Sequence, residues 1–154
     1  KLYAVSSLFG KRNEPADRQD KVAGDIHVAQ ATIGIIGADT VVYHNGKVLG
    51  KPKDEADAKA MLSMLSGIEH EVITGVCIIR NGNPETVAKI SKVKFYNLTE
   101  EESSAYVATK EPMDKAGAYG IQGLGCKLVE KIEGDYFNIV GLPVAEVCRR
   151  IKNL

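Results

Sequence analysis

An apolar run at residues 33–36 is followed almost at once by a carboxylate, and this arrangement constrains the fold more than any other feature of the chain. The run is short, rich in β-branched residues and bounded by glycine, which predicts a buried strand. Asp39 would then be held at the edge of a core, where a metal ion or a phosphate could reach its carboxylate. An acid in such a place is rarely buried without a partner. The plain alternative is that Asp39 caps the next turn and binds only backbone.

The composition is that of an ordinary folded domain. The chain has 154 residues, of which 44% are hydrophobic and 26% charged, so we expect one domain, residues 1–154, with a real core. Its 20 basic and 20 acidic residues cancel, so the overall charge indicates neither a nucleic-acid nor a membrane partner. No apolar stretch reaches the roughly 18–20 residues of a membrane helix and no signal peptide is evident, which predicts a cytoplasmic protein with reduced cysteines.

Alternating strand and helix patterns predict an α/β fold with a mixed twisted sheet and flanking helices. Asn45-Gly46 is a strong hairpin signal, and residues 81–84 have the composition of a turn. Strands are predicted at residues 1–6, 32–38, 41–44, 47–49, 71–80, 86–95 and 128–132, and helices at residues 15–30, 55–65, 99–109 and from 143 onward.

Helix ends are marked by capping residues. Asp54 is a good N-cap for the second helix, and Thr99 with Glu102 three residues later forms a capping box. The last helix is expected to turn Val144, Val147, Cys148 and Ile151 inward.

Two loops carry groups that could bind an anion. Lys51 and Lys53 flank a proline just before a helix N-terminus, which adds N–H donors, although a solvated turn is the plain alternative. The second loop, residues 111–125, has four glycines within nine residues beside Lys115 and Gln122. Each glycine costs roughly 0.5–1 kcal/mol in regular structure, so their number favours a binding surface over simple turns.

Other phosphate and catalytic motifs are missing from the sequence. It has no G-x-x-x-x-G-K-[ST] loop and no G-x-S-x-G elbow. Gly123-Leu124-Gly125 begins a dinucleotide fingerprint, but Leu128 stands where its third glycine belongs. The three histidines show no zinc-ligand spacing.

Several motifs follow one another in a distinctive order along the chain. They are Gly-Ala-Asp-Thr-Val-Val at residues 37–42, Leu-Gly-Lys-Pro-Lys-Asp at 49–54, the helix end at 61–67, His-Glu-Val-Ile-Thr-Gly-Val at 70–76, the glycine-rich loop, and residues 133–143. Together these motifs closely resemble the Maf family of nucleotide pyrophosphatases. The likeness covers residues 16–150.

The resemblance implies an ITPase-like α/β fold with a cleft between two lobes, and often a homodimer. It implies hydrolysis of a nucleoside triphosphate to the monophosphate and pyrophosphate with Mg²⁺ or another divalent cation such as Mn²⁺. Thr40 and residues 118–122 resemble the branch that acts on dTTP and UTP, not the branch that acts on 7-methyl-GTP.

The resemblance also implies roles for individual residues. Asp39 corresponds to the catalytic acid that accepts a proton, and we expect it to bind the metal as well. Lys51 and Lys21 correspond to active-site lysines, and Thr40 and Gln122 to positions for base selection. Apart from the resemblance, the positive charges of Lys115, Lys53 and Arg12 make them our further candidates for binding substrate phosphates.

The region before residue 15 departs from the family pattern. Leu8-Phe9-Gly10 replaces a proline-containing loop, and Lys11 and Arg12 are the only nearby basic pair. We therefore expect either that part of the phosphate loop is missing from this sequence or that the protein has lost part of its phosphate binding. The alternative to an enzyme is a non-catalytic nucleotide-binding or regulatory protein of septum formation.

Overall fold

The computed structural model of the chain describes residues 2–4 and 34–153, and these form a sheet with helices on it. The predicted helix over residues 15–30 lies outside the described residues. The sheet has six strands in the order β1-β2-β4-β5-β6, with β3 paired to β2. The strands are β1 (Leu2–Ala4), β2 (Gly34–His44), β3 (Lys47–Leu49), β4 (Glu69–Arg80), β5 (Asn83–Phe95) and β6 (Val129–Glu133).

The helices confirm the predicted α/β class. They are α1 (Glu55–Leu65), α2 (Glu100–Ala108), α3 (Tyr136–Val140) and α4 (Val144–Asn153), with three short 3₁₀ helices, η1 (Glu111–Asp114), η2 (Ala116–Ala118) and η3 (Leu124–Leu128), between α2 and β6. The five ladders between described strands are all antiparallel, so the parallel pairing of a mixed sheet is not found among them.

Two tight hairpins connect the long strands. Asn45 and Gly46 have φ values of 46° and 78°, the positive pair that a type I′ turn requires, and they join β2 to β3 as predicted. The β4–β5 turn is shorter than the predicted span of residues 81–84, because Pro84 already lies in β5 and pairs with Ile79. Proline is tolerated there because β6 pairs only with the far end of β5, which leaves an edge without a described neighbour.

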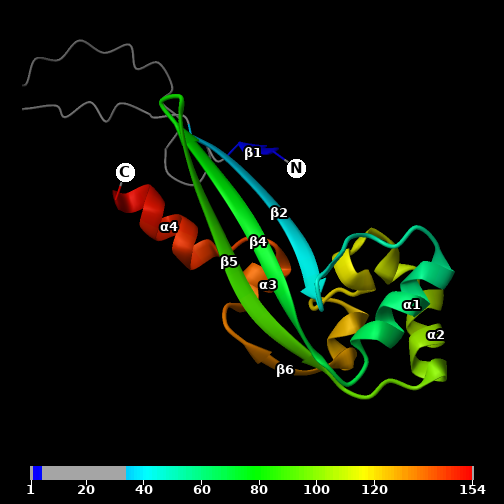
Figure 1. The fold of residues 1–154 in the computed structure, drawn as a ribbon. Coiled ribbons are helices and arrows are strands. Elements are labelled where there is room, and N and C mark those ends of the chain that lie inside the picture. Colours follow the sequence, from blue (N-terminus) through cyan, green and yellow to red (C-terminus); the bar gives the residue numbers. More distant parts are fainter. Residues whose placement is uncertain (1, 5–33, 154) are drawn as a thin grey trace, which may run out of the picture.

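One face of the sheet carries the core. Alternate residues of β4 are buried, as expected when one face of a strand is covered: His70, Val72, Thr74, Val76 and Ile78. The helices α1 and α2 pack over one end of this face and α4 packs over the other (Figure 1). The short helix α3 lies between them and contacts β4 and β5.

Helix capping follows the sequence closely. The Asp54 side chain accepts a hydrogen bond from the Asp57 N–H at 2.8 Å, and Thr99 and Glu102 form the predicted capping box. In α4, Val147 is buried as expected, but Val144 is 40% exposed, so the inward face of this helix is narrower than predicted.

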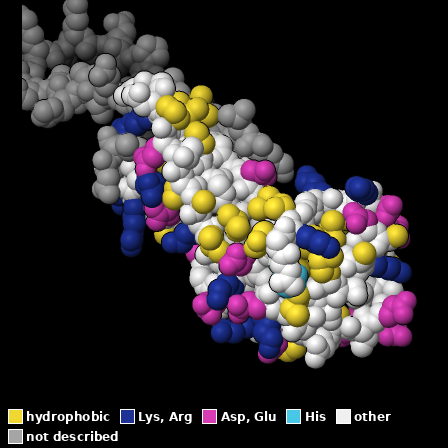
Figure 2. Space-filling model, in the orientation of Figure 1, with side chains coloured by type: hydrophobic (Ala, Val, Ile, Leu, Met, Phe, Trp, Pro, Cys, Tyr) yellow, Lys and Arg dark blue, Asp and Glu magenta, His cyan; other side chains and the backbone are white. Residues whose placement is uncertain are grey.

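Neither positive nor negative side chains dominate the described residues on the face seen in Figure 2. Lysine, arginine and acidic side chains are interspersed on the face seen in Figure 2, in keeping with the balanced composition. Within the described ranges, none of the helices combines the length and apolar character that crossing a membrane requires.

Candidate active site

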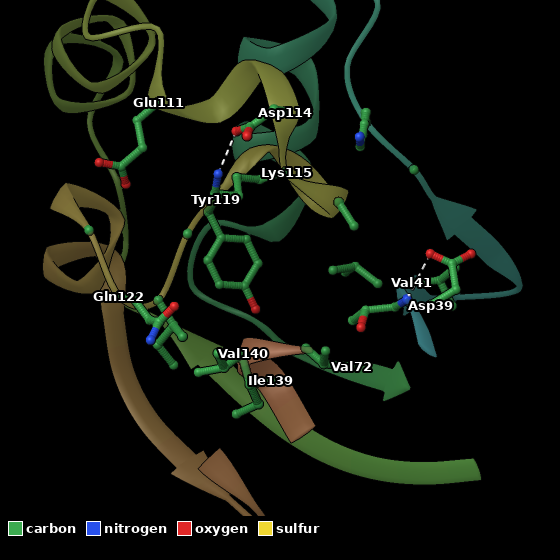
Figure 3. Close-up of a pocket in the computed structure, with 18 of the residues that line it drawn as sticks. Asp39, Val41, Val72, Glu111, Asp114, Lys115, Tyr119, Gln122, Ile139 and Val140 are labelled. Carbon is green, nitrogen blue, oxygen red and sulfur yellow. Dashed lines mark hydrogen bonds and ion pairs between the residues drawn. The ribbon is translucent and has the colours of Figure 1, made fainter. Parts of the chain in front are cut away.

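A cleft of about 800 Å³ opens between β2 and the loops that follow α2. It brings together Asp39, Thr40, Lys51, Lys115 and Gln122, all five of them predicted site residues. Figure 3 shows Asp39 and Gln122 on opposite sides of this space, with Val72, Ile139 and Val140 forming an apolar side. Other residues that line it are Glu111, Asp114, Tyr119 and Gly120.

Asp39 does not end a strand, as the sequence predicted, but lies in the middle of the continuous strand β2. It is accessible because β1 pairs with residues 35–37 and β3 with residues 42–44, so residues 38–41 have a described partner strand only on the β4 side. The carboxylate is exposed and accepts a hydrogen bond of 3.0 Å from the Thr40 N–H. The backbone is thus fixed by the β2–β4 ladder while the acid faces the cleft.

Thr40 leaves β2 on the face opposite to Asp39, where it pairs across the sheet with Thr74. The two hydroxyl oxygens are 2.8 Å apart, and the Thr74 hydroxyl donates to the carbonyl oxygen of Asn138 at 2.8 Å. Thr74 is fully buried, whereas Thr40 lines the cleft. Thr40 is therefore the outer end of a buried chain of hydroxyl groups.

Two of the predicted lysines lie in the cleft. Lys51 follows β3, and Lys115 forms an ion pair with Asp114. The hydrogen bond from Lys115 lowers the pKa of Asp114, and the charge of Lys51 adds a smaller lowering effect. Lys53 is not among the residues that line the cleft, and its N–H donates to Asp57 instead. Lys21 and Arg12 lie outside the described residues.

The wall that carries Gln122 is held by one carboxylate. Glu111 accepts hydrogen bonds from the N–H groups of Leu124 at 2.8 Å and Gly125 at 3.0 Å, and from the Tyr106 hydroxyl at 2.9 Å. The Tyr106 oxygen in turn accepts from the Gly120 N–H at 3.0 Å. Burial works to raise the pKa of Glu111, but these donors outweigh it and the pKa falls below its ordinary value.

The glycines of this loop serve close packing within the chain. Gly117 has a φ of 67°, and a Cβ atom there would lie 2.8 Å from Val42 on β2. A Cβ atom at Gly125 would lie 2.5 Å from the Tyr106 hydroxyl. The sequence interpretation of these glycines as a ligand-binding surface was therefore incomplete, because at both positions the close approach is to a side chain of the protein itself.

Tyr119 belongs to the core, although it also lines the cleft. It is 5% exposed, its ring packs edge-on against Phe95, and its hydroxyl is 2.9 Å from Nε2 of His70. Burial, with a smaller repulsion from His44, lowers the pKa of His70 to about 4. His70 is therefore a neutral core side chain at neutral pH, and it links β4 to the loop.

The donor set of the cleft suits a metal shared with a ligand. In the part of the chain that the structure describes, no three His, Cys, Asp or Glu side chains gather into a metal cage. Mg²⁺ is usually held by one or two carboxylates together with phosphate oxygens and water. Asp39 offers one exposed carboxylate in the cleft, so these residues fit a cation that a phosphate ligand helps to bind.

Several supporting residues were missed by sequence reasoning. Glu111, Tyr106, Thr74 and Asn138 act through hydrogen bonds to groups 5 to 64 positions away in the chain. Thr74 alone carried a local signal, since it is a polar residue on the buried face of a strand. Such a group needs a hydrogen-bond partner.

The fold and the site define an α/β protein whose cleft is lined by two lysines, by the carboxylates of Asp39, Glu111 and Asp114, and by apolar side chains along one side. This combination suits a ligand with an anionic tail and a flat apolar body. The sequence pattern of the Maf-like protein family matches residues 10–154, and the chain belongs to this family.

Relatives with curated names support the assignment. The dTTP/UTP pyrophosphatase of Bacillus cytotoxicus is 52% identical over 153 residues, which cover 96% of this chain and 80% of that protein. The dTTP/UTP pyrophosphatase of Geobacillus sp. (strain WCH70) is 56% identical over 120 residues, covering 78% of this chain and 64% of that protein. The chain thus spans less than two thirds of the Geobacillus relative.

Proposed function

We propose that this protein is a nucleoside triphosphate pyrophosphatase that converts dTTP and UTP to the monophosphate and pyrophosphate. One observation carries the proposal: in a member of the Maf family, Asp39, Lys51 and Lys115 line a single cleft. The name of the relatives supports the choice of substrates. Related or modified pyrimidine nucleotides would fit the same cleft.

The two parts of the cleft suggest how the substrate lies. Lysines act as mobile point charges that suit a polyphosphate tail, so the phosphates belong beside Lys51 and Lys115. The flat pyrimidine belongs against Val72, Ile139 and Val140, whose apolar side chains can pack on its face. Thr40 and Gln122 supply polar contacts to its edge.

The proposed reaction is an attack by water on the α phosphorus. Asp39 accepts a proton from the water as the new bond to phosphorus forms. The bond between the α phosphorus and the bridging oxygen breaks, and its electron pair leaves with pyrophosphate. Lys51 and Lys115 neutralise the negative charge that grows on the leaving group, because positioning and electrostatics dominate phosphoryl transfer.

We propose that Asp39 also holds a divalent cation, with Mg²⁺ as the first choice and Mn²⁺ as an alternative. When bound, such an ion would add positive charge at the phosphate oxygens. Chelation with EDTA should then abolish turnover, and activity that persists would remove the metal from the proposal.

The proposal extends to assembly and cellular role. Exposed apolar side chains in and after α3 support a homodimer: Tyr136, Phe137, Leu142 and Val144. Sedimentation of a single 16.6 kDa species at micromolar concentration would contradict it. Removal of unwanted pyrimidine nucleotides from the cytoplasmic pool, with an effect on septum formation, is the role we propose.

The decisive experiment is a screen for pyrophosphate release from common and modified triphosphates in Mg²⁺, with orthophosphate measured in parallel. We expect pyrophosphate from dTTP and UTP, and far less from purine triphosphates. Release of orthophosphate instead would place cleavage at a different bond. Nucleotide binding without any pyrophosphate would favour the regulatory alternative.

A further inference from the structure

The inference concerns the row of hydrogen bonds that connects the Thr40 hydroxyl, the Thr74 hydroxyl and the Asn138 carbonyl oxygen, and it rests on the proposed function. The Thr74 hydroxyl donates to the Asn138 carbonyl oxygen at 2.8 Å, and its own oxygen lies 2.8 Å from the Thr40 hydroxyl oxygen. Thr74 and Asn138 are both fully buried. Water therefore does not compete for the hydrogen bond between Thr74 and Asn138.

The directions of these hydrogen bonds follow from counting protons. A hydroxyl group has one proton to donate, and a carbonyl oxygen has none. Because the Thr74 proton is engaged with the Asn138 carbonyl, the bond between Thr74 and Thr40 must use the Thr40 proton. The Thr40 oxygen then has only lone pairs to offer to anything in the cleft.

The inner end of the chain is fixed. The Asn138 carbonyl oxygen accepts a second bond from the Gly141 N–H at 3.1 Å, so it has two donors for its two lone pairs. The Asn138 side-chain amide donates to the Val72 carbonyl at 3.0 Å and to the Ser91 hydroxyl at 2.9 Å. These bonds tie α3 to β4 and β5 and prevent the carbonyl from turning away from Thr74.

Thr40 also lies in the apolar part of the cleft. Its side chain is on the same face of β2 as Val42, which pairs with Val72. A Cβ atom placed on Gly141, directly after α3, would be 3.4 Å from the Thr40 hydroxyl oxygen. Thr40 therefore adjoins the segment of Ile139 and Val140, where the proposed function puts the base.

We propose that Thr74 is a positioning residue that makes Thr40 a hydrogen-bond acceptor and thereby selects pyrimidines with a protonated ring nitrogen. The ring N3–H of uracil and thymine is the one donor on the pairing edge of those bases, so an acceptor at Thr40 meets it. Cytosine has a lone pair at the same nitrogen. Two lone pairs would then face each other, and a buried polar group left unpaired costs binding free energy.

The test removes the Thr74 hydroxyl and measures discrimination between bases. In Thr74→Val the Thr40 proton is released and can turn to the cleft, so the ratio of kcat/KM for UTP over CTP should fall about tenfold. UTP methylated at N3 lacks the critical proton. The wild-type protein should turn it over at least about tenfold more slowly than UTP, and Thr74→Val should narrow this difference.

Matched variants separate positioning from a merely structural effect. Thr74→Ser keeps the hydroxyl group and should have the wild-type ratio of kcat/KM for UTP over CTP. In a Thr40→Val background, Thr74→Val should add nothing to the change in the ratio, because the two residues act as one unit. Thr74→Ala serves if the valine variant fails to fold, with thermal unfolding as the check.

The outcomes distinguish this inference from the proposed function. If the wild-type protein releases no pyrophosphate from dTTP or UTP, the proposed function itself fails. If it does, but the Thr74 variants keep the wild-type UTP-to-CTP and UTP-to-N3-methyl-UTP ratios, the positioning role of Thr74 is overturned and the proposed function stands.

Discussion

The two walls of the cleft are built by different means. The sheet wall places Asp39 and Thr40 on β2, whose backbone is paired with β4 from Gly34 to Tyr43. The loop wall places Lys115 and Gln122 on a segment of 3₁₀ helices. Glu111 in η1 accepts two hydrogen bonds from η3 and a third from Tyr106 in α2. Side chains on the first wall are fixed by a repeating ladder, and those on the second depend on one carboxylate. We therefore expect proton transfer by Asp39 to depend on the sheet wall, and the contribution of Gln122 to base selection, beside that of Thr40, to be sensitive to the loop wall.

The largest effect should come from Asp39→Asn on the sheet wall. The amide cannot accept the proton of the attacking water, so kcat should fall by at least about 100-fold, the usual range for loss of a general base. The free energy of unfolding should not change, because the side chain is exposed and, among residues 2–4 and 34–153, its one hydrogen bond is from the adjacent N–H. Steady-state pyrophosphate release and denaturant unfolding measure the two quantities.

A matched control is Asp54→Asn, which makes the same chemical change at the N-cap of α1, outside the cleft. Asparagine also caps helices well, so both activity and stability should persist. Full turnover in Asp39→Asn would remove Asp39 from the role of base.

Glu111→Ala should have the next largest effect, and it tests the loop wall. The change deprives two N–H groups and the Tyr106 hydroxyl of their shared acceptor, which should lower the free energy of unfolding by about 2 kcal/mol. It should also weaken the preference for pyrimidines, because Gln122 lies on the segment that Glu111 holds. Denaturant unfolding and the substrate screen are the measurements.

Glu111→Gln is the informative comparison, since it keeps an acceptor oxygen and loses the charge. Its stability should lie between those of the wild-type protein and Glu111→Ala. The pKa of Glu111 is lowered in the folded protein, so the stabilisation by its charge is present above the pKa of the unfolded chain and is lost as the pH falls through the folded value. If the free energy of unfolding is unchanged in both variants, the hydrogen bonds to Glu111 do not stabilise the loop wall.

The contact between the two walls can be tested at His70, which lies on β4 and contacts Tyr119 of the loop wall. Its pKa is about 4 in the folded protein, against about 6.5 in an unfolded chain, so the unfolded state binds the proton more readily. Stability is therefore full above about pH 6.5 and is lost as the pH falls toward 4. Between pH 7 and pH 5 this loss should amount to about 2 kcal/mol.

The measurement is the free energy of unfolding from denaturant titrations at several pH values. His70→Gln cannot titrate and should lack most of the loss between pH 7 and pH 5, although its stability at pH 7 will be lower. His44→Gln, at the end of β2, should keep most of the pH dependence, because burial is a larger cause of the lowered pKa of His70 than the repulsion from His44. If the free energy of unfolding of the wild-type protein is the same at pH 5 and pH 7, His70 is protonated without loss of stability and its pKa is not lowered by folding.

The difference between the walls also explains what the sequence could predict. Hairpins, caps and strands depend on neighbouring residues, so Asn45-Gly46, the Asp54 cap and the alternation in β4 could be anticipated. The continuity of β2 through Asp39 could not, because pairing with β4 overrides the local break suggested by Gly37. The role of Glu111 depends on donors 13 and 14 positions away, and no local pattern encodes such a contact. The hydroxyl chain from Thr40 to Asn138 is equally non-local.

The smallest effect is expected from Gln122→Ala. This variant removes one side chain of the loop wall and leaves the backbone of that wall in place, so it separates direct contact with the base from the structure of the wall. Gln122 is exposed, and its side chain makes no hydrogen bond to any residue that the structure describes, so stability should be unchanged. Loss of one hydrogen bond to the base should reduce the preference for dTTP and UTP by about 2- to 10-fold, and kcat for the best substrate should change less. If the substrate ranking is unchanged here but flattened in Glu111→Ala, the loop wall selects the base through its shape or another group. If the ranking flattens in both, Gln122 is the contact and Glu111 is the residue that holds it in place.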